Sequence, residues 1–185
     1  MTLRHRGLGI AIGMVADQVF ADPQKHHPVA WFGSWATRVE KTTHADNRAA
    51  GAVFAVLAVA PVLAGGMLVE RVSARHGWVR VAATAAATWA ALGARRLADE
   101  GRIMADRLEG GDLDAAREQL PNLCGRDPRF LDAEGLGRAT VESMAENTND
   151  AGVCTIFWGA LAGVPGILTR SEEHTSELQS RFSIS

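Results

Sequence analysis

The sequence predicts an all-α protein that crosses a lipid bilayer several times. Two stretches of nineteen residues carry no charge, Gly51–Val69 and Ala151–Thr169. A bilayer core of ~30 Å requires about 20 mostly apolar residues in a helix, so both stretches are expected to cross it. A soluble helical domain is the alternative, but two such stretches are hard to bury in a chain of 185 residues. About four apolar helices are expected, with amphipathic helices in a cytoplasmic loop.

Two further apolar segments are weaker, Gly7–Ala21 and the alanine-rich Val81–Ala94. The second is long enough only if it extends backwards and Arg80 reaches the membrane surface with its long side chain. The first contains Asp17 and lacks a convincing cleavage site, so it is interpreted as an uncleaved membrane segment. A charge at mid-membrane costs several kcal/mol unless it has a partner. Asp17 is therefore expected to face other helices or to lie near the interface.

Four crossings assign the remaining segments to two sides of the membrane. Residues 22–50 and 95–150 share one side, and the N-terminus and residues 70–80 share the other. The distribution of arginine and lysine favours the cytoplasm for the two long loops, according to the positive-inside rule. Both polar, motif-bearing loops are thus expected on the cytoplasmic face of a bacterial inner membrane.

Composition excludes some functions. The net charge is −2 and the pI is near 6.3, which does not predict the basic patch of a nucleic-acid-binding protein. Cys124 and Cys154 lack CxxC or His-rich spacing and are expected to be reduced thiols. The glycines of GLGIAIG have the wrong spacing for a dinucleotide-binding loop, and the sequence contains no P-loop or nucleophile elbow.

The tail Arg170–Ser185 differs abruptly from the rest in being rich in serine and glutamate. Its RSEEHTSELQS string is also the translation of a common sequencing-adapter oligonucleotide. We therefore interpret the tail as an artefact and confine the fold prediction to residues 1–169. A genuine disordered tail is the alternative.

The first polar loop includes residues 21–33, ADPQKHHPVAWFG. Its two X-Pro steps disfavour helix and favour turns. Lysine and histidine both donate hydrogen bonds to anionic oxygens, so this loop is a candidate phosphate pocket. A solvated interfacial loop is the alternative. The candidate substrate-binding residues are Asp22, Lys25 and His27.

The second polar loop begins with an amphipathic helix over residues 97–109. Asp112 and Asp132 are expected to cap the two helices that follow. Between them, Arg126 and Asp127 lie in a turn bounded by glycine and proline. The Arg126 guanidinium suits bidentate binding of phosphate, and a local pair with Asp127 is an equal alternative.

A cluster of carboxylates and amides, VESMAENTND, ends this loop. Arg138, Glu142 and Glu146 share one helix face at i, i+4 and i+8, and Asp150 extends it if the helix persists. An ordinary salt-bridged face is the alternative. However, Glu142 and Glu146 repel each other unless something positive lies between them. A divalent cation or a substrate ammonium would relieve this, because carboxylates and amides such as Asn147 suit hard cations.

Three motifs in this order resemble one family. They are DP…HPV…G after the first apolar run, a GRD turn, and VES-x-AEN-x-x-D leading into FWG-x-x-x-G-x-PG. Residues 7–168 are similar to the adenosylcobinamide-phosphate synthases, the CobD/CbiB proteins of cobalamin biosynthesis. Pro128 departs from the family, which commonly has threonine there. Asp150-Ala151 and Cys154-Thr155 replace its usual Asp-Gly and Ala-Pro. The family continues with Asn-Thr-x-Asp and more membrane helices, so the chain is expected to be a fragment, inactive alone.

The resemblance implies a multi-pass membrane protein that joins adenosylcobyric acid to aminopropanol, or to its phosphate, through an amide bond. ATP and Mg²⁺ are the implied cofactors. Phosphoryl transfer needs cations, for which Lys25, His27 and Arg126 are the candidates. The candidate catalytic residues are Glu142, Glu146, Asp150 and Asn147, and the three carboxylates are also the candidate ligands for metal or for the ammonium. One carboxylate would accept the amine proton, and Asn147 would orient a substrate oxygen.

Two other function classes remain open from sequence alone. Carboxylates at a membrane helix commonly mark ion paths, so a transporter or cation-binding subunit is the first alternative. A non-catalytic assembly subunit is the second.

Overall fold

The computed structural model describes residues 2–20, 35, 37–39, 41–43 and 48–169. Its regular elements are all helical, and the described residues contain no strand. The all-α prediction is therefore confirmed. The helices are α1 (Thr2–Val19), α3 (Arg48–Ser73), α4 (Gly77–Leu92), α5 (Ala94–Glu109), α6 (Leu113–Gln119), the 3₁₀ turn η1 (Leu120–Asn122), α7 (Ala133–Asn147), the π-helical turn η2 (Thr148–Val153) and α8 (Cys154–Ala162).

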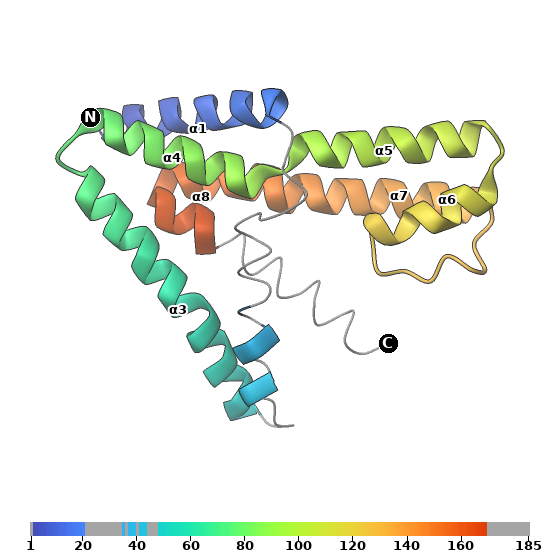
Figure 1. Ribbon diagram of the computed structural model, residues 1–185, viewed down its shortest axis with the longest axis horizontal. Helices are drawn as coiled ribbons and strands as arrows, with labels where there is room; N and C mark the ends of the chain where they lie inside the picture. The colour runs from blue at the N-terminus through green and yellow to red at the C-terminus, as the bar shows by residue number, and fades with distance from the viewer. Residues whose placement is uncertain (1, 21–34, 36, 40, 44–47, 170–185) are drawn as a thin grey trace.

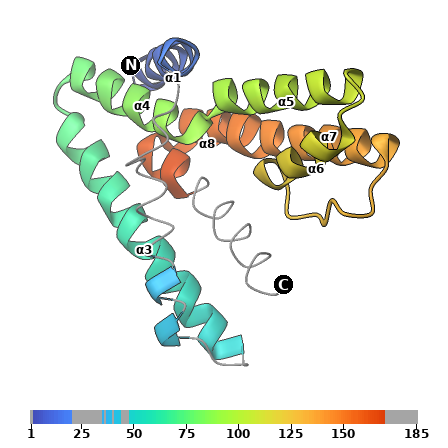
Figure 2. The same cartoon turned by 45° about the vertical axis from the view of Figure 1, so that its right-hand side comes forward.

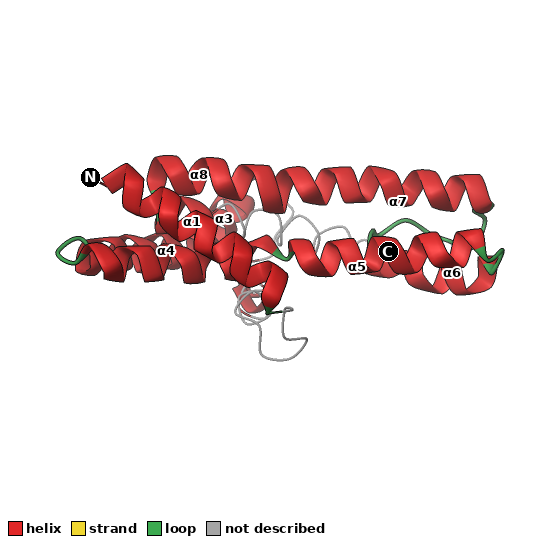
Figure 3. Cartoon of the chain, turned by 90° about the horizontal axis from the view of Figure 1, so that it is seen from above, coloured by secondary structure: helices red, strands yellow, loops and turns green. Residues whose placement is uncertain are grey.

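Two long rods form the frame of the molecule (Figure 1). The first rod is α4 followed by α5, which are separated by Gly93 alone. Gly93 has φ 54° and ψ 20°, a left-handed conformation that glycine adopts without steric cost. The second rod is α7, η2 and α8, a helical path without interruption that runs antiparallel to the first (Figure 3). The turn η2 contacts both α4 and α5, so the irregular points of the two rods lie at the same level.

One half of the frame packs like a small soluble domain. Helices α5, α6 and α7 surround a core of buried apolar side chains: Met104, Ala116, Leu120, Leu123, Leu136 and Ala139. The predicted caps are confirmed. An oxygen of Asp112 accepts from the Ala115 N–H at 3.1 Å, and one of Asp132 accepts from the Gly135 N–H at 2.8 Å. Each cap satisfies a donor that the first helical turn leaves without a partner.

The other half consists of α1, α3, α4 and α8, and α1 packs closely on α4. A Cβ added at Gly9 would lie 2.7 Å from the Cβ of Thr84, and one at Gly13 would lie 2.6 Å from that of Thr88. Glycines four residues apart allow two helix backbones to approach closely, a pattern common in membrane helices. The GLGIAIG segment, which fits no dinucleotide loop, is thus a helix-packing motif.

Asp17 lies near the end of α1 and is 2% exposed. Its Oδ2 accepts a hydrogen bond from the backbone N–H of Arg95 at 3.0 Å, at the start of α5. The prediction that Asp17 faces other helices is confirmed. Its carboxylate compensates the positive end of the α5 dipole.

The opposite end of this half carries a cluster of three charged side chains. Arg6 Nη2 lies 2.7 Å from Glu70 Oε1, and Arg80 Nε lies 3.6 Å from the same oxygen. Arg6 also donates to the Leu161 carbonyl at 2.8 Å. The N-terminus and residues 70–80 therefore share one end, as the loop assignment expects. Arg80 meets a carboxylate here, which the snorkelling interpretation did not include.

The expected single helix over Ala151–Thr169 is wrong. The α8 helix has nine residues, about 14 Å, and ends at Gly163 with φ 74°. Residues 164–169 are helical again beyond that turn. Among the described residues, one helix is long and apolar enough to cross a membrane, Val53–Ser73 within α3. Helix α3 meets the other helices at its C-terminal end, next to the turn into α4, and its N-terminal end points away from them (Figure 2).

Candidate functional site

The structure brings two of the sequence motifs together. Arg126, from the GRD turn before α7, donates from Nη2 to Glu142 Oε2 at 3.0 Å. The two side chains are 51% and 53% exposed, so the pair lies on the surface and is open to a ligand. Helix α6 runs back alongside α7, and the loop 123–132 then leads to the start of α7 (Figure 1). Arg126, early in this loop, therefore reaches Glu142 in the second half of α7. Of the two alternatives for Arg126, the local pair with Asp127 does not form.

Asp127 instead pairs with Arg129, a residue that sequence reasoning did not select. Arg129 donates from Nη2 to Asp127 Oδ2 at 2.7 Å and from Nε to Oδ1 at 3.0 Å. The Arg129 backbone N–H also donates to Oδ1 at 3.0 Å. These side-chain and backbone hydrogen bonds lower the pKa of Asp127 from 3.8 to about 2. Asp127 therefore holds the turn next to Arg126 in its ionised form.

A buried hydroxyl joins the same loop to α7 from inside. Ser143 is 4% exposed, and its Oγ donates to the Leu123 carbonyl at 2.6 Å. Asn147 Nδ2 donates to the Ser143 carbonyl at 2.8 Å and to Ser143 Oγ at 3.1 Å. Asn147 was predicted from the sequence to accompany the carboxylates, whereas Ser143 was not predicted. The pattern that could have identified Ser143 is a small polar residue on the buried face of an amphipathic helix.

The carboxylate stripe continues because the helix persists beyond Asn147. Glu146 is exposed and Asp150 is half-buried in η2, where Asn149 Nδ2 donates to Asp150 Oδ1 at 3.1 Å. Arg138 pairs with Glu134 at 3.2 Å, one turn earlier, and leaves Glu142 to Arg126. The π-helical form of η2 is rare and occurs frequently at functional sites. The wide turn carries Asp150, the last carboxylate of the motif.

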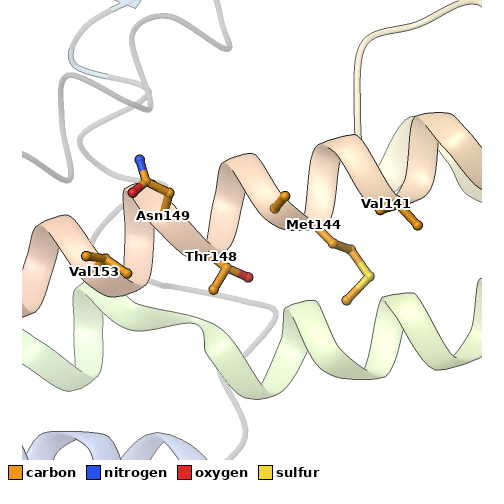
Figure 4. A pocket seen from close by; sticks show the side chains of 6 residues that line it. Val141, Met144, Thr148, Asn149 and Val153 are labelled. Carbon is orange, nitrogen blue, oxygen red and sulfur yellow. The ribbon is translucent and has the colours of Figure 1, made fainter.

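An open groove of about 530 Å³ lies along the same helix. Figure 4 shows the Met144 and Thr148 side chains directed toward the neighbouring rod and Asn149 directed away from it. The groove is mostly apolar, and none of the candidate catalytic residues lines it. Its lining residues are Val141, Met144, Ala145, Thr148, Asn149 and Val153.

Within the described ranges, no three side chains of His, Cys, Asp or Glu form a metal-binding group. Mg²⁺ is usually bound by one or two carboxylates together with water and substrate phosphates. The positive charge of Arg126 beside Glu142 also reduces the repulsion between Glu142 and Glu146. The role of Glu142, Glu146 and Asp150 as metal ligands stays a prediction.

The remaining predicted binding residues cannot be placed. Asp22, Lys25 and His27 lie outside the described residues. Their candidate role in phosphate binding stays a prediction.

Comparison with known proteins agrees with the motif order. The family model described as CobD/Cbib protein matches residues 10–171. The chain belongs to the CobD/CbiB family. A cobalamin biosynthesis protein CobD of Mycobacterium tuberculosis is 50% identical over 167 residues, covering 90% of this chain and 53% of that protein. The protein of the same name from Chromobacterium violaceum is 32% identical over 167 residues, covering 88% and 54%.

A third relative with that name, from Rhodobacter capsulatus, is 36% identical over 143 residues, 76% of this chain and 46% of that protein. The CobD/CbiB chain described here thus spans about half the length of the curated relatives it matches. No solved structure matches it.

Proposed function

We propose that the full-length protein acts in cobalamin biosynthesis by forming the amide bond between adenosylcobyric acid and aminopropanol or its phosphate. Membership of the CobD/CbiB family and the names of its relatives support the pathway. The reaction itself follows from the resemblance of the motifs and from the chemistry that the site can support.

The observation that carries the proposal is the contact between Arg126 and Glu142. An amide-forming enzyme that uses ATP needs a cation for phosphoryl oxygens next to a carboxylate that can meet an amine. The exposed pair supplies both groups within 3.0 Å. Substrate binding is expected to break this ion pair, so that Arg126 binds phosphate and Glu142 binds the ammonium group.

The reaction balances in two steps. The γ-phosphoryl group of ATP passes to a corrinoid carboxylate, which yields an acyl phosphate and ADP. The bound ammonium group loses one proton to become the amine. The amine then attacks the acyl carbon, phosphate leaves, and a second proton is lost from nitrogen. Arg126 would neutralise phosphoryl oxygens in both steps, and Glu142 or Glu146 would accept the proton. Bound Mg²⁺, held by Glu146 and Asp150, would neutralise further phosphate charge.

Exposed apolar side chains support a multi-pass location in the membrane. Val15 on α1, Val56 and Leu68 on α3, and Leu161 on α8 are each more than half exposed. Apolar patches of this kind on several helices mark contact with lipid or with other helices. The α5–α7 half has its own core of buried apolar side chains, which suits the cytoplasmic loop expected over residues 95–150.

Nothing in the described geometry favours a transporter over a synthase. Asp17 caps α5, and Glu70 is held between Arg6 and Arg80, so both acidic groups have structural partners. Carboxylates on an ion path need to exchange their ligands, and the fixed partners of Asp17 and Glu70 do not suit such a role.

The test is amide product formed by a full-length relative that carries the same residues, measured alongside ion flux in vesicles. Glu146→Gln is expected to lower product formation strongly because it removes a proton acceptor and a metal donor. Glu134→Gln is the matched control, since Glu134 lies on the same helix and pairs with Arg138 away from the site. Ion flux without synthesis in the unaltered protein would refute the proposal. Unchanged turnover in Glu146→Gln would remove that residue from the site.

A further inference from the structure

The loop that carries Arg126 is attached to α7 at two points on adjacent residues. On the outer side, Glu142 accepts from Arg126 at 3.0 Å. On the inner side, Ser143 donates to the carbonyl of Leu123 at 2.6 Å. Leu123 lies three residues before Arg126, and its side chain is buried in the α5–α7 core. The segment 123–126 is therefore fixed at its start, and Arg126 is the first guanidinium after that point.

The orientation of the Ser143 hydroxyl is determined by its two neighbours. A serine hydroxyl has one proton to donate and lone pairs to accept with. The Leu123 carbonyl can only accept, so it takes the proton. The Asn147 amide N–H then donates to Ser143 Oγ at 3.1 Å while also bonding the Ser143 carbonyl at 2.8 Å. The result is a directed chain of hydrogen bonds from Asn147 through Ser143 to the loop.

We propose that Ser143 is a positioning residue for the site, which holds the 123–126 segment so that Arg126 meets Glu142 and the substrate phosphate. This inference rests on the proposed function. It gives Asn147 a defined part as well, since its amide fixes the hydroxyl rotor that binds the loop. A misplacement of about 1 Å at a reacting group can lower the rate roughly 10²-fold. The loss of one buried hydrogen bond that positions Arg126 can therefore lower the rate by a similar factor.

The helix supplies a matched control one turn earlier. Thr140 is also buried, at 7% exposed, and its Oγ1 donates at 2.8 Å to the carbonyl of Leu136 in the same helix. Thr140→Val removes a buried hydroxyl from α7 without removing a bond to the loop. Ser143→Ala removes the bond to the loop. A difference between the two variants therefore reports on the loop and not on the general loss of a buried hydroxyl.

Two measurements test the proposal in a full-length relative with these residues. Hydrogen exchange of the backbone amides over 123–129 is expected to accelerate in Ser143→Ala and to stay unchanged in Thr140→Val. The kcat/KM for amide formation is expected to fall by roughly 10- to 100-fold in Ser143→Ala alone. In an Arg126→Gln background, Ser143→Ala is expected to add no further loss, because both changes act on the same contact.

Equal exchange in the two hydroxyl variants would overturn the proposal, and so would a full additional loss of kcat/KM in the Arg126→Gln background. The proposed function fails in a different way. If the unaltered protein makes no amide, or if Arg126→Gln retains full turnover, the role of Arg126 in synthesis is refuted. Faster exchange in Ser143→Ala would still show in that case that Ser143 orders the segment.

Discussion

Asp17 accepts a hydrogen bond from the backbone N–H of Arg95 at 3.0 Å, across 78 residues of sequence. The bond joins the end of α1 to the start of α5, at the level where both rods change direction or helical form. A buried carboxylate is expensive unless it has partners, and here the first turn of a helix provides one. The contact fixes the boundary between the apolar half and the α5–α7 half.

Replacing Asp17 is therefore expected to loosen that boundary. Asp17→Ala should lower the free energy of unfolding by about 1–2 kcal/mol, the cost of losing an acceptor at a helix N-terminus. Asp17→Asn keeps an acceptor oxygen and should cost less. Asp99→Ala is the control, because Asp99 meets only exposed arginine side chains, Arg95 at 3.4 Å and Arg102 at 3.0 Å. Thermal unfolding in detergent measures the difference, and equal midpoints for Asp17→Ala and Asp99→Ala would contradict the assignment.

The close packing of α1 on α4 gives a second prediction. Gly13→Ala would place a Cβ 2.7 Å from the Ala85 carbonyl oxygen, which belongs to the backbone and cannot turn away. Overpacking of this kind costs roughly 1–3 kcal/mol. Gly7→Ala is the control in the same helix, since nothing lies within 4 Å of its added Cβ. A lower unfolding midpoint is expected for Gly13→Ala alone, and a normal midpoint there would show that the two helices are not in this contact.

The helix ends show most clearly how much of the structure could be predicted from the sequence. Asp112 and Asp132 could be predicted as caps because a capping bond spans only three residues. Arg126 and Glu142 could be selected separately by residue type, but their pairing depends on how the loop returns to α7. The break at Gly163 was missed because an apolar run with glycine and proline fits both a membrane helix and a turn. A local Arg126–Asp127 pair was an equal alternative from sequence because the two residues are adjacent, whereas the turn at Pro128 places Arg129 against Asp127.

The turn at Asp127 carries a prediction about pH. Its pKa in the folded chain, about 2, lies below the ordinary value of 3.8, because Arg129 bonds the ionised form. The ionised carboxylate therefore stabilises the folded turn above about pH 4, and that contribution is lost as the pH falls toward 2. Arg129→Gln should return the pKa toward 3.8. Titration of the Asp127 carboxyl by NMR checks this, with Arg102→Gln as a control, since Arg102 pairs with Asp99 on α5 and not with the loop. A pKa of 3.8 in the unaltered chain would contradict the prediction.

The membrane arrangement can be tested by labelling two exposed positions at opposite ends of the first rod. Single cysteines replace Arg75, in the turn before α4, and Glu109, at the end of α5, after Cys124 and Cys154 are changed to alanine. An impermeant maleimide is expected to label Arg75→Cys in intact cells and to reach Glu109→Cys only after permeabilisation. That pattern follows from the cytoplasmic assignment of residues 95–150. Equal labelling of both positions in intact cells would refute it.

The Arg126–Glu142 contact is tested most directly by amide product from a full-length relative in which each partner is neutralised. An exposed ion pair contributes only about 0–1 kcal/mol to stability, so neither change should unfold the protein. Arg102→Gln and Asp99→Asn are matched controls, because that pair is also exposed and also 3.0 Å apart. Arg126→Gln and Glu142→Gln should each lower turnover by about 10²-fold or more while the controls keep it. Full turnover in both site variants would contradict the account.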